Sequence, residues 1–220
     1  MGFSSVIFDW RGTLVTTLSP QAWAVEALRL AGRPAGTAEA EGVVRALEQA
    51  DPDGARLDAP GVDCDAAVHR QTYFDVFAEA GIDPHLASAL YAVESDPRHN
   101  PFATDAAQTL GRLKQQGVRV AVLSDVHFDI RPAFAAAGLH GLVDTFVLSF
   151  EHGVQKPDPA MFTAALQGLG AGAEDTLMVG DRSRPDGAAV ECGITTLLLP
   201  PLRSTADRRL DRVPLLCGAG

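Results

Sequence analysis

Hydrophobic positions follow two different patterns along this chain. Short, nearly continuous apolar runs occur near the start and again throughout the second half. Runs of this kind, bounded by Gly, Pro, Asp or Ser, are typical of strands that are buried on both faces of a parallel sheet. They predict strands at residues 5–8, 118–123, 145–148, 176–179 and 195–198.

Residues 16–100 show helical spacing and no convincing strand. Ser19 followed by Pro20 is a good helix start, because Ser caps the first turn and Pro fits its first position. Further helices are predicted at residues 38–49, 64–79 and 85–93, with a loop rich in Asp, Pro and Gly at 51–62.

The second half alternates strand and helix patterns, which favours an α/β fold with a doubly wound parallel sheet. In such a sheet the ligand crevice lies beyond the carboxyl ends of the strands. The first, second and fourth predicted strands are each followed at once by a motif, and these motifs contain Asp9, Ser124 and Asp181. We therefore expect these three residues to meet, despite their separation in sequence.

The tail beyond Pro200 is the hardest part to interpret. It contains four arginines and favours a solvated terminal helix over a partner-binding strip; the arginines are Arg203, Arg208, Arg209 and Arg212.

Composition and charge narrow the possible classes of protein. A chain of 220 residues with 46% hydrophobic residues can bury a substantial core. A formal net charge of -10 argues against nucleic-acid and anionic-membrane partners. No apolar stretch approaches the roughly 20 residues of a membrane span, and the first apolar run is too short for a signal peptide. Three cysteines without CxxC spacing suit reduced thiols, so we expect a cytoplasmic protein.

Four short motifs follow apolar stretches in a fixed order. They are Asp9-Trp10-Arg11-Gly12-Thr13, Leu123-Ser124-Asp125, Gln155-Lys156-Pro157-Asp158-Pro159, and Gly180-Asp181 with Asp186. Together they resemble the haloacid dehalogenase (HAD) superfamily, whose members are mostly magnesium-dependent phosphatases that use an aspartyl nucleophile. The resemblance implies a Rossmann-like core at residues 1–15 and 101–220, with an inserted α-helical cap domain at residues 16–100.

The resemblance also assigns roles to individual residues. Asp9 would be the nucleophile, since a carboxylate that attacks phosphorus splits one hard displacement into two easier ones. Thr13 would order the loop after Asp9. Ser124 would donate to phosphate oxygens, with Asp125 in a supporting, substrate-binding position. Lys156 would stabilise both the nucleophile and the transferred group.

A phosphoryl group brings negative charge to a carboxylate, so a cation must offset the repulsion. Mg²⁺ suits this task, because it takes few protein carboxylates and keeps several waters. By resemblance its ligands would be Asp9, the backbone carbonyl of Arg11 and Asp181, with Asp186 binding directly or through a water. The implied substrate is a small phosphate ester or acyl phosphate.

Arg11 departs from the pattern, because HAD phosphatases carry a second Asp at this position. That Asp protonates the leaving oxygen and later activates water, and arginine stays protonated and can do neither. We expect Arg11 to point inward, where it would pair with Asp9, Asp181 or Asp186 and compete with Mg²⁺. In the alternative arrangement it points away, and only its carbonyl faces the metal.

Two other functions remain open from the sequence. A carbon-halogen hydrolase also lacks the second Asp, because a halide leaves without a proton. A catalytically weak phosphate-ester-binding or regulatory protein would keep the fold and Asp9. The sequence leaves the oligomeric state open, and the cap offers several candidate substrate contacts: Arg56, His69, Arg70, Tyr73, Arg98 and His99.

Overall fold

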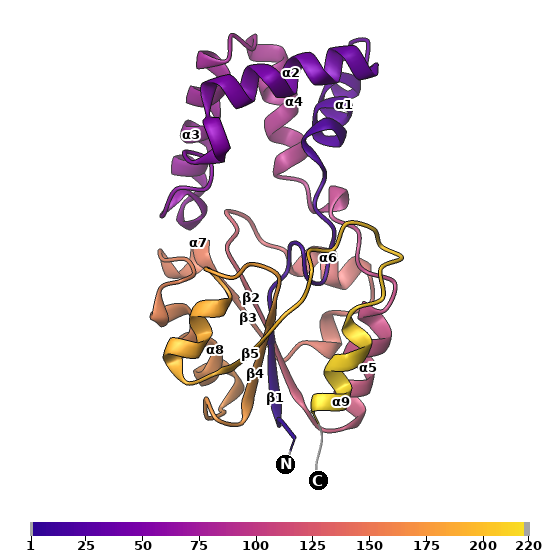
Figure 1. Ribbon diagram of the computed structural model, residues 1–220, viewed down its shortest axis with the longest axis vertical. Helices are drawn as coiled ribbons and strands as arrows, with labels where there is room; N and C mark the ends of the chain where they lie inside the picture. The colour runs from indigo at the N-terminus through magenta and orange to yellow at the C-terminus, as the bar shows by residue number, and fades with distance from the viewer. Residues whose placement is uncertain (1, 218–220) are drawn as a thin grey trace.

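The computed structural model describes residues 2–217, and a sheet of five parallel strands in the order β3-β2-β1-β4-β5 lies at its centre (Figure 1). The strands are β1 (Ser5–Phe8), β2 (Arg119–Ser124), β3 (Thr145–Leu148), β4 (Thr176–Gly180) and β5 (Thr195–Leu198). β1 pairs with both β2 and β4. Asp9, the residue after β1, therefore lies at the carboxyl end of the central strand.

Different helices cover the two faces of this sheet. On one face, Phe8 and Val122 pack with α5 (Ala106–Gln115), α6 (Arg131–Ala136) and α9 (Val213–Leu216). On the other face, Ile7 and Leu123 pack with α8 (Pro159–Leu169). Neighbouring strand residues point to opposite faces, so continuous apolar runs are needed where both faces are buried.

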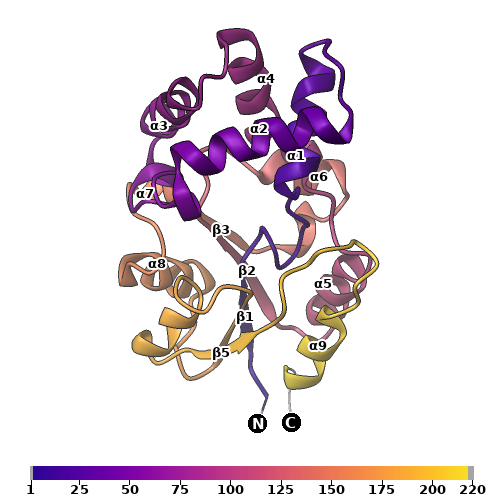
Figure 2. The same ribbon diagram turned by 45° about the horizontal axis from the view of Figure 1, so that its top comes forward.

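Four helices form a separate layer above the carboxyl ends of the strands, as Figures 1 and 2 show. They are α1 (Pro20–Leu30), α2 (Thr37–Ala50), α3 (Ala66–Glu79) and α4 (Pro84–Glu94). These helices share their own hydrophobic cluster, with Val44, Phe77 and Leu90 at its centre. The layer is the helical cap of an α/β fold, as the sequence predicted.

The segments that enter and leave the cap run side by side. The Thr16 amide donates to the Pro101 carbonyl at 3.0 Å, and the Asn100 side chain donates to the Thr16 carbonyl at 2.9 Å. These contacts lie at the predicted boundaries between cap and core, residues 15/16 and 100/101, and the division itself stays a prediction.

The remaining helical segments are short. They are α7 (Ser149–His152) and the 3₁₀ turns η1 (Pro52–Gly54), η2 (Val62–Cys64), η3 (Pro97–His99), η4 (His140–Leu142), η5 (Gly187–Cys192) and η6 (Leu210–Arg212). Two of these turns lie in or at the end of the predicted loop at residues 51–62. None of the helices within residues 2–217 has both the length and the apolar character needed to cross a bilayer.

The prediction of a solvated terminal helix is wrong for most of the tail, where the only α-helix of the described residues is the short α9 (Val213–Leu216). Residues 200–209 form no helix, and Leu202, Leu210 and Val213 are buried in the core cluster. Arg209 reaches back to the loop after Asp9, where its Nη2 donates to the Thr13 carbonyl at 2.8 Å. Apolar anchors spaced along the tail hold it against the core, and Arg209 supports the loop of the first motif.

Candidate active site

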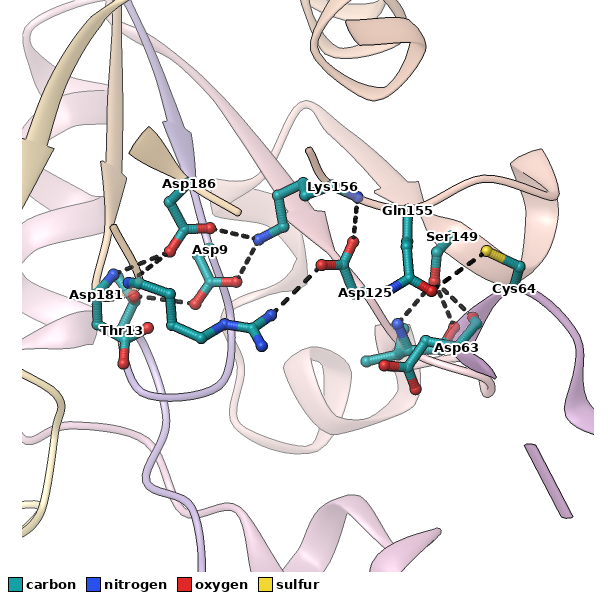
Figure 3. Close-up of polar contacts among 12 residues, drawn as sticks. Asp9, Thr13, Asp63, Cys64, Asp125, Ser149, Gln155, Lys156, Asp181 and Asp186 are labelled. Atoms are coloured by element: carbon teal, nitrogen blue, oxygen red, sulfur yellow. Dashed lines mark hydrogen bonds and ion pairs between the residues drawn. The ribbon is translucent and has the colours of Figure 1, made fainter. Parts of the chain in front are cut away.

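The structure brings the predicted residues together at the carboxyl edge of the sheet. Asp9 follows the central strand β1, Ser124 ends β2, and Asp181 follows β4. The Asp9 amide continues the sheet by donating to the Val179 carbonyl at 2.9 Å. Asp9 is only 4% exposed, and its side chain lies among the other acidic residues in Figure 3.

Lys156 joins two of these carboxylates. Its Nζ donates to Asp9 Oδ1 at 2.7 Å and to Asp186 Oδ1 at 2.6 Å, and its side chain is fully buried (Figure 3). Burial by itself would lower the pKa of Lys156, but Asp9 and Asp186 raise this pKa above its ordinary value. The ammonium therefore stays charged and holds the Asp9 carboxylate in one orientation.

Burial and mutual repulsion raise the pKa of two carboxyl groups in the site. Burial raises the pKa of Asp9 to about 6, although Lys156 opposes the shift. Burial also raises the pKa of Asp181 to about 6, with Asp9 and Asp186 adding to the effect. A bound cation would offset the excess negative charge of these buried carboxylates.

The donor set fits a hard divalent cation. Oxygens of Asp9, Asp181 and Asp186 lie within 4.8 Å of one another, and Asp181 Oδ1 is buried without a hydrogen-bond partner among residues 2–217. All three are carboxylate donors, which Mg²⁺ prefers. A Cβ at Gly12 would lie 2.4 Å from Asp181 Oδ2, so only glycine leaves this carboxylate in place.

Asp186 has a second task besides its contact with Lys156. Its Oδ2 accepts from the Asp181 amide at 3.1 Å and from the Arg182 amide at 2.9 Å. The carboxylate is completely buried and fixes the turn that presents Asp181.

The expectation that Arg11 points toward the acidic cluster is wrong. Its Nη1 donates to Glu94 Oε1 at 2.5 Å, and its Nη2 donates to the Glu94 carbonyl at 2.9 Å. Glu94 is the last residue of α4 in the cap, where exposed carbonyls favour a cation. The guanidinium carbon also lies 5.5 Å from the Trp10 ring centroid and 5.7 Å from that of Phe128. Arg11 therefore connects the core to the cap, and its guanidinium does not pair with Asp9, Asp181 or Asp186.

The three remaining predicted residues occupy distinct positions. Thr13 Oγ1 donates to Asp9 Oδ2 at 3.0 Å, which fixes the second oxygen of that carboxylate. Ser124 is buried and lines the same cavity as Asp9. Asp125 Oδ1 accepts from the Lys156 amide at 2.9 Å, and Asp125 Oδ2 lies 3.4 Å from Arg182 Nη2. Asp125 thus positions the loop that carries Lys156.

A cavity of about 890 Å³ lies between this edge and the cap. Asp9, Ser124 and Asp181 line its core side, and Tyr73 and Glu94 line its cap side. Its size suits a small organic molecule.

Of the candidate cap contacts, only Tyr73 lines this cavity. His69 is buried between cap and core, Arg70 stacks on Phe74, and His99 lines a smaller, separate cavity. Two arginines pair with acids on the cap surface: Arg56 with Glu79, and Arg98 with Asp96.

Sequence reasoning missed several residues at the seam between cap and core. They are Glu94, Asp63, His127, Gln155 and Arg182. Gln155 begins the third motif and Arg182 follows Asp181 of the fourth, and these positions were the one available signal. Nothing in the pattern around Glu94 or Asp63 distinguishes them from other acids of the helical block.

Comparison with known proteins gives one family and several partial relatives. The family model of haloacid dehalogenase-like hydrolases matches residues 3–192. The chain is 30% identical over 138 residues to a phosphoserine phosphatase from Thermus thermophilus, a match that covers 60% of this chain and 55% of that protein. It is 36% identical over 111 residues to a ribulose-1,5-bisphosphate 5-phosphatase from Halopiger xanaduensis, covering 49% and 46% of the two chains.

The fold also matches solved structures along nearly the whole chain. A 2-haloacid dehalogenase from Pseudomonas syringae pv. Tomato superposes with a TM-score of 0.66 at 24% identity, covering 97% of each chain. The match to the curated relatives is shorter, and the chain spans about half of their length.

Proposed function

Because the chain belongs to the haloacid dehalogenase-like hydrolases, we propose that it is a Mg²⁺-dependent phosphohydrolase that works through an aspartyl-phosphate intermediate. Its substrate is a small phosphate ester or acyl phosphate. The observation that carries this proposal is the orientation of Asp9, whose two oxygens are held by Lys156 and Thr13 at the edge of a small-molecule cavity. Phosphatases among the partial relatives support the same reaction class.

Two displacements at phosphorus account for the reaction. An Asp9 oxygen attacks the phosphorus, the bond from phosphorus to the leaving oxygen breaks, and that oxygen departs with the electron pair. Water then attacks the phosphorus of phospho-Asp9, and the bond to Asp9 breaks. Inorganic phosphate and the free carboxylate result.

The residues around Asp9 support charge stabilisation in both steps. The buried Lys156 ammonium adjoins the attacking oxygen, and Ser124 faces the same cavity. Asp9, Asp181 and the Arg11 carbonyl would hold the magnesium ion, and Asp186 would bind it directly or through a water. When bound, the ion supplies positive charge that offsets the repulsion between carboxylate and phosphoryl oxygens.

No general acid stands where HAD phosphatases have one, because Arg11 is charged and bound to Glu94. Burial would lower the pKa of Arg11, but Glu94 raises it above its ordinary value. Loss of a general acid commonly costs about 10²- to 10⁴-fold in rate. We therefore expect the enzyme to favour leaving groups that depart without a proton, such as acyl or aryl oxygens.

Phosphate release tests this function. Acetyl phosphate and p-nitrophenyl phosphate would be supplied to the native protein and to Asp9→Asn, with magnesium or with EDTA. We expect release that needs both magnesium and Asp9. Release that is the same in the native protein and Asp9→Asn would contradict the proposal.

The missing acid also gives a carbon-halogen hydrolase some support, because a halide needs no proton to leave. Halide release from a 2-haloacid, with no phosphate release from either ester, would favour that second function. Binding of a phosphate ester without any turnover would favour a binding or regulatory protein.

A further inference from the structure

One acid on the cap side of this cavity has no lysine or arginine partner among residues 2–217. Asp63 belongs to η2 and lines the same cavity as Asp9. Its Oδ1 lies 3.7 Å from His69 Nε2 and 3.8 Å from His127 Nδ1, which is beyond hydrogen-bond distance. Within residues 2–217, no protein group donates a hydrogen bond to the Asp63 carboxylate at 3.5 Å or less.

Asp181 belongs to the proposed metal site, and the other enclosed charges around the cavity are already matched. Arg11 binds Glu94, Arg182 lies beside Asp125, and Lys156 binds Asp9. The acid Asp58 also lines the cavity, but it is exposed to solvent. Asp63, with 27% of its side chain exposed, is thus the partly enclosed acid on the cap side that faces the cavity without a lysine or arginine partner.

Asp63 is ionised at neutral pH. Burial would raise its pKa, but His127, His69 and the Arg11 guanidinium together lower the pKa below its ordinary value. His69 itself stays neutral, because burial and then His127 lower its pKa to about 3. The imidazole of His69 therefore does not neutralise the carboxylate.

The backbone holds Asp63 firmly in place. The Ser149 hydroxyl donates to the Asp63 carbonyl at 2.7 Å, and the Gly61 amide donates to Gln155 Oε1 at 2.8 Å (Figure 3). These contacts fix the η2 turn against the core. A carboxylate fixed in advance loses little freedom when a ligand binds to it.

A metal ion does not suit this cluster. The rings of His69 and His127 are stacked, with centroids 3.4 Å apart and planes inclined by 18°. Their nitrogen lone pairs therefore run side by side, whereas two imidazoles that share a metal must aim at one point about 2 Å from each nitrogen. A hydrogen-bond donor that enters from the cavity has no such requirement.

We propose that Asp63 binds an ammonium group on the leaving-group side of the substrate, so that the substrate is a phosphate ester or acyl phosphate whose leaving group carries an amine. The assignment rests on the proposed phosphohydrolase function, in which the phosphoryl group sits at Asp9 and the leaving group extends toward the cap. An ammonium offers N–H donors to an ionised carboxylate, and such charge-assisted bonds are the strong ones. An anionic group at the same place would be repelled.

Unreactive analogues test the proposal without turnover. The probes are 3-aminopropylphosphonate and butylphosphonate, which differ by an ammonium in place of a methyl group. Calorimetry with magnesium present would give both affinities for the native protein, for Asp63→Asn and for the matched control Asp58→Asn. We expect a native preference for the amine of about 10- to 100-fold, the range of a hydrogen bond to a charged group. The preference should fall to within about threefold in Asp63→Asn and persist in Asp58→Asn.

Several results would overturn the assignment: equal native affinities, no binding of either probe, or a preference that survives in Asp63→Asn. Asp63→Glu, which keeps the charge, should keep part of the preference and covers the case in which Asp63→Asn does not fold. Phosphate release from p-nitrophenyl phosphate separates the two proposals. If release depends on Asp9 while the probes bind equally, only the assignment of Asp63 fails.

Discussion

The two sides of the catalytic cavity are built differently. On the core side, Asp9, Lys156 and Asp186 form one buried hydrogen-bonded unit at the end of a parallel sheet. On the cap side, Glu94 and Asp63 come from separate cap segments and meet core residues across a seam. Arg11 is only two residues from Asp9, yet its side chain belongs to the cap side. Proximity in sequence to Asp9 therefore does not place a side chain in this buried unit.

The largest loss of stability and turnover should come from removing the Lys156 ammonium on the core side. Lys156→Met leaves Asp9 and Asp186 buried without a counter-charge, which commonly costs about 3–5 kcal/mol of unfolding free energy. Turnover should fall by about 10²- to 10³-fold, the usual loss for one stabilising donor. Denaturant unfolding and phosphate-release assays would measure the two losses.

The exposed lysine serves as the control. Lys114→Met should change stability by less than about 1 kcal/mol, since its ion pair with Asp144 lies at the surface. Equal losses from the two substitutions would show that Lys156 has no special role.

An aspartate introduced at Arg11 should raise activity only when Glu94, the partner of Arg11, is also changed. Arg11→Asp places a carboxylate beside Glu94, so repulsion at the seam should offset the benefit of the new acid. Arg11→Asp combined with Glu94→Gln removes that repulsion. The double variant should hydrolyse alkyl phosphates at least about tenfold faster than Arg11→Asp alone, a part of what a general acid contributes. Steady-state rates would check this, and no difference between the two variants would weaken the account of Arg11.

The raised pKa values of Asp9 and Asp181 predict a pH dependence on the core side. Both carboxyls have a pKa of about 6, so magnesium affinity should fall as pH drops through that value. A protonated carboxyl is a poor metal ligand, and each pH unit below about 6 should weaken binding about tenfold or more. Calorimetric titrations at about pH 5 and about pH 8 would measure the change. Equal affinities at both values would contradict the shared acidic site.

The raised pKa of Asp181 also determines how the stability of the metal-free protein changes with pH. A carboxyl whose folded pKa is raised contributes stability below its ordinary pKa of 3.8, and this contribution is lost as pH rises through about 6. Asp181→Asn should therefore stabilise the metal-free protein above that pH. After allowance for solvent screening we expect about 1 kcal/mol, or about 2–4 °C in Tm. A lower Tm in thermal scans with EDTA would contradict this sign.

The smallest effect should come from a single seam contact. Gln155→Ala removes the acceptor for the Gly61 amide and should cost about 0.5–1.5 kcal/mol of unfolding free energy. Hydrogen exchange at η2 should increase more than exchange in β1. Uniform exchange across both segments would show that the seam does not open separately.

The core could be predicted from the sequence because each of its signals is local. The five predicted strands are present, with ends that shift by at most one residue, and three of the motifs directly follow them. A parallel sheet then has to bring Asp9, Ser124 and Asp181 to one edge. The cap helices were also predictable to within two residues from capping residues and apolar spacing.

The seam could not be predicted, because it depends on how two layers dock. The direction of Arg11 is set by Glu94, which is 83 residues away at the end of cap helix α4. The tail was misjudged for a related reason, since its arginines suggested solvent while Leu202, Leu210 and Val213 anchor it to the core. Contacts between distant elements leave no periodic pattern in the sequence.

Trapping the covalent intermediate tests the central claim most directly. The native protein would be mixed with acetyl phosphate and magnesium, quenched in acid within milliseconds, digested and examined by mass spectrometry. The account predicts a phosphoryl group on Asp9 in the native protein and none on the corresponding peptide of Asp9→Asn. Phosphate release that requires Asp9 and magnesium, with the phosphoryl group on another residue, would contradict it.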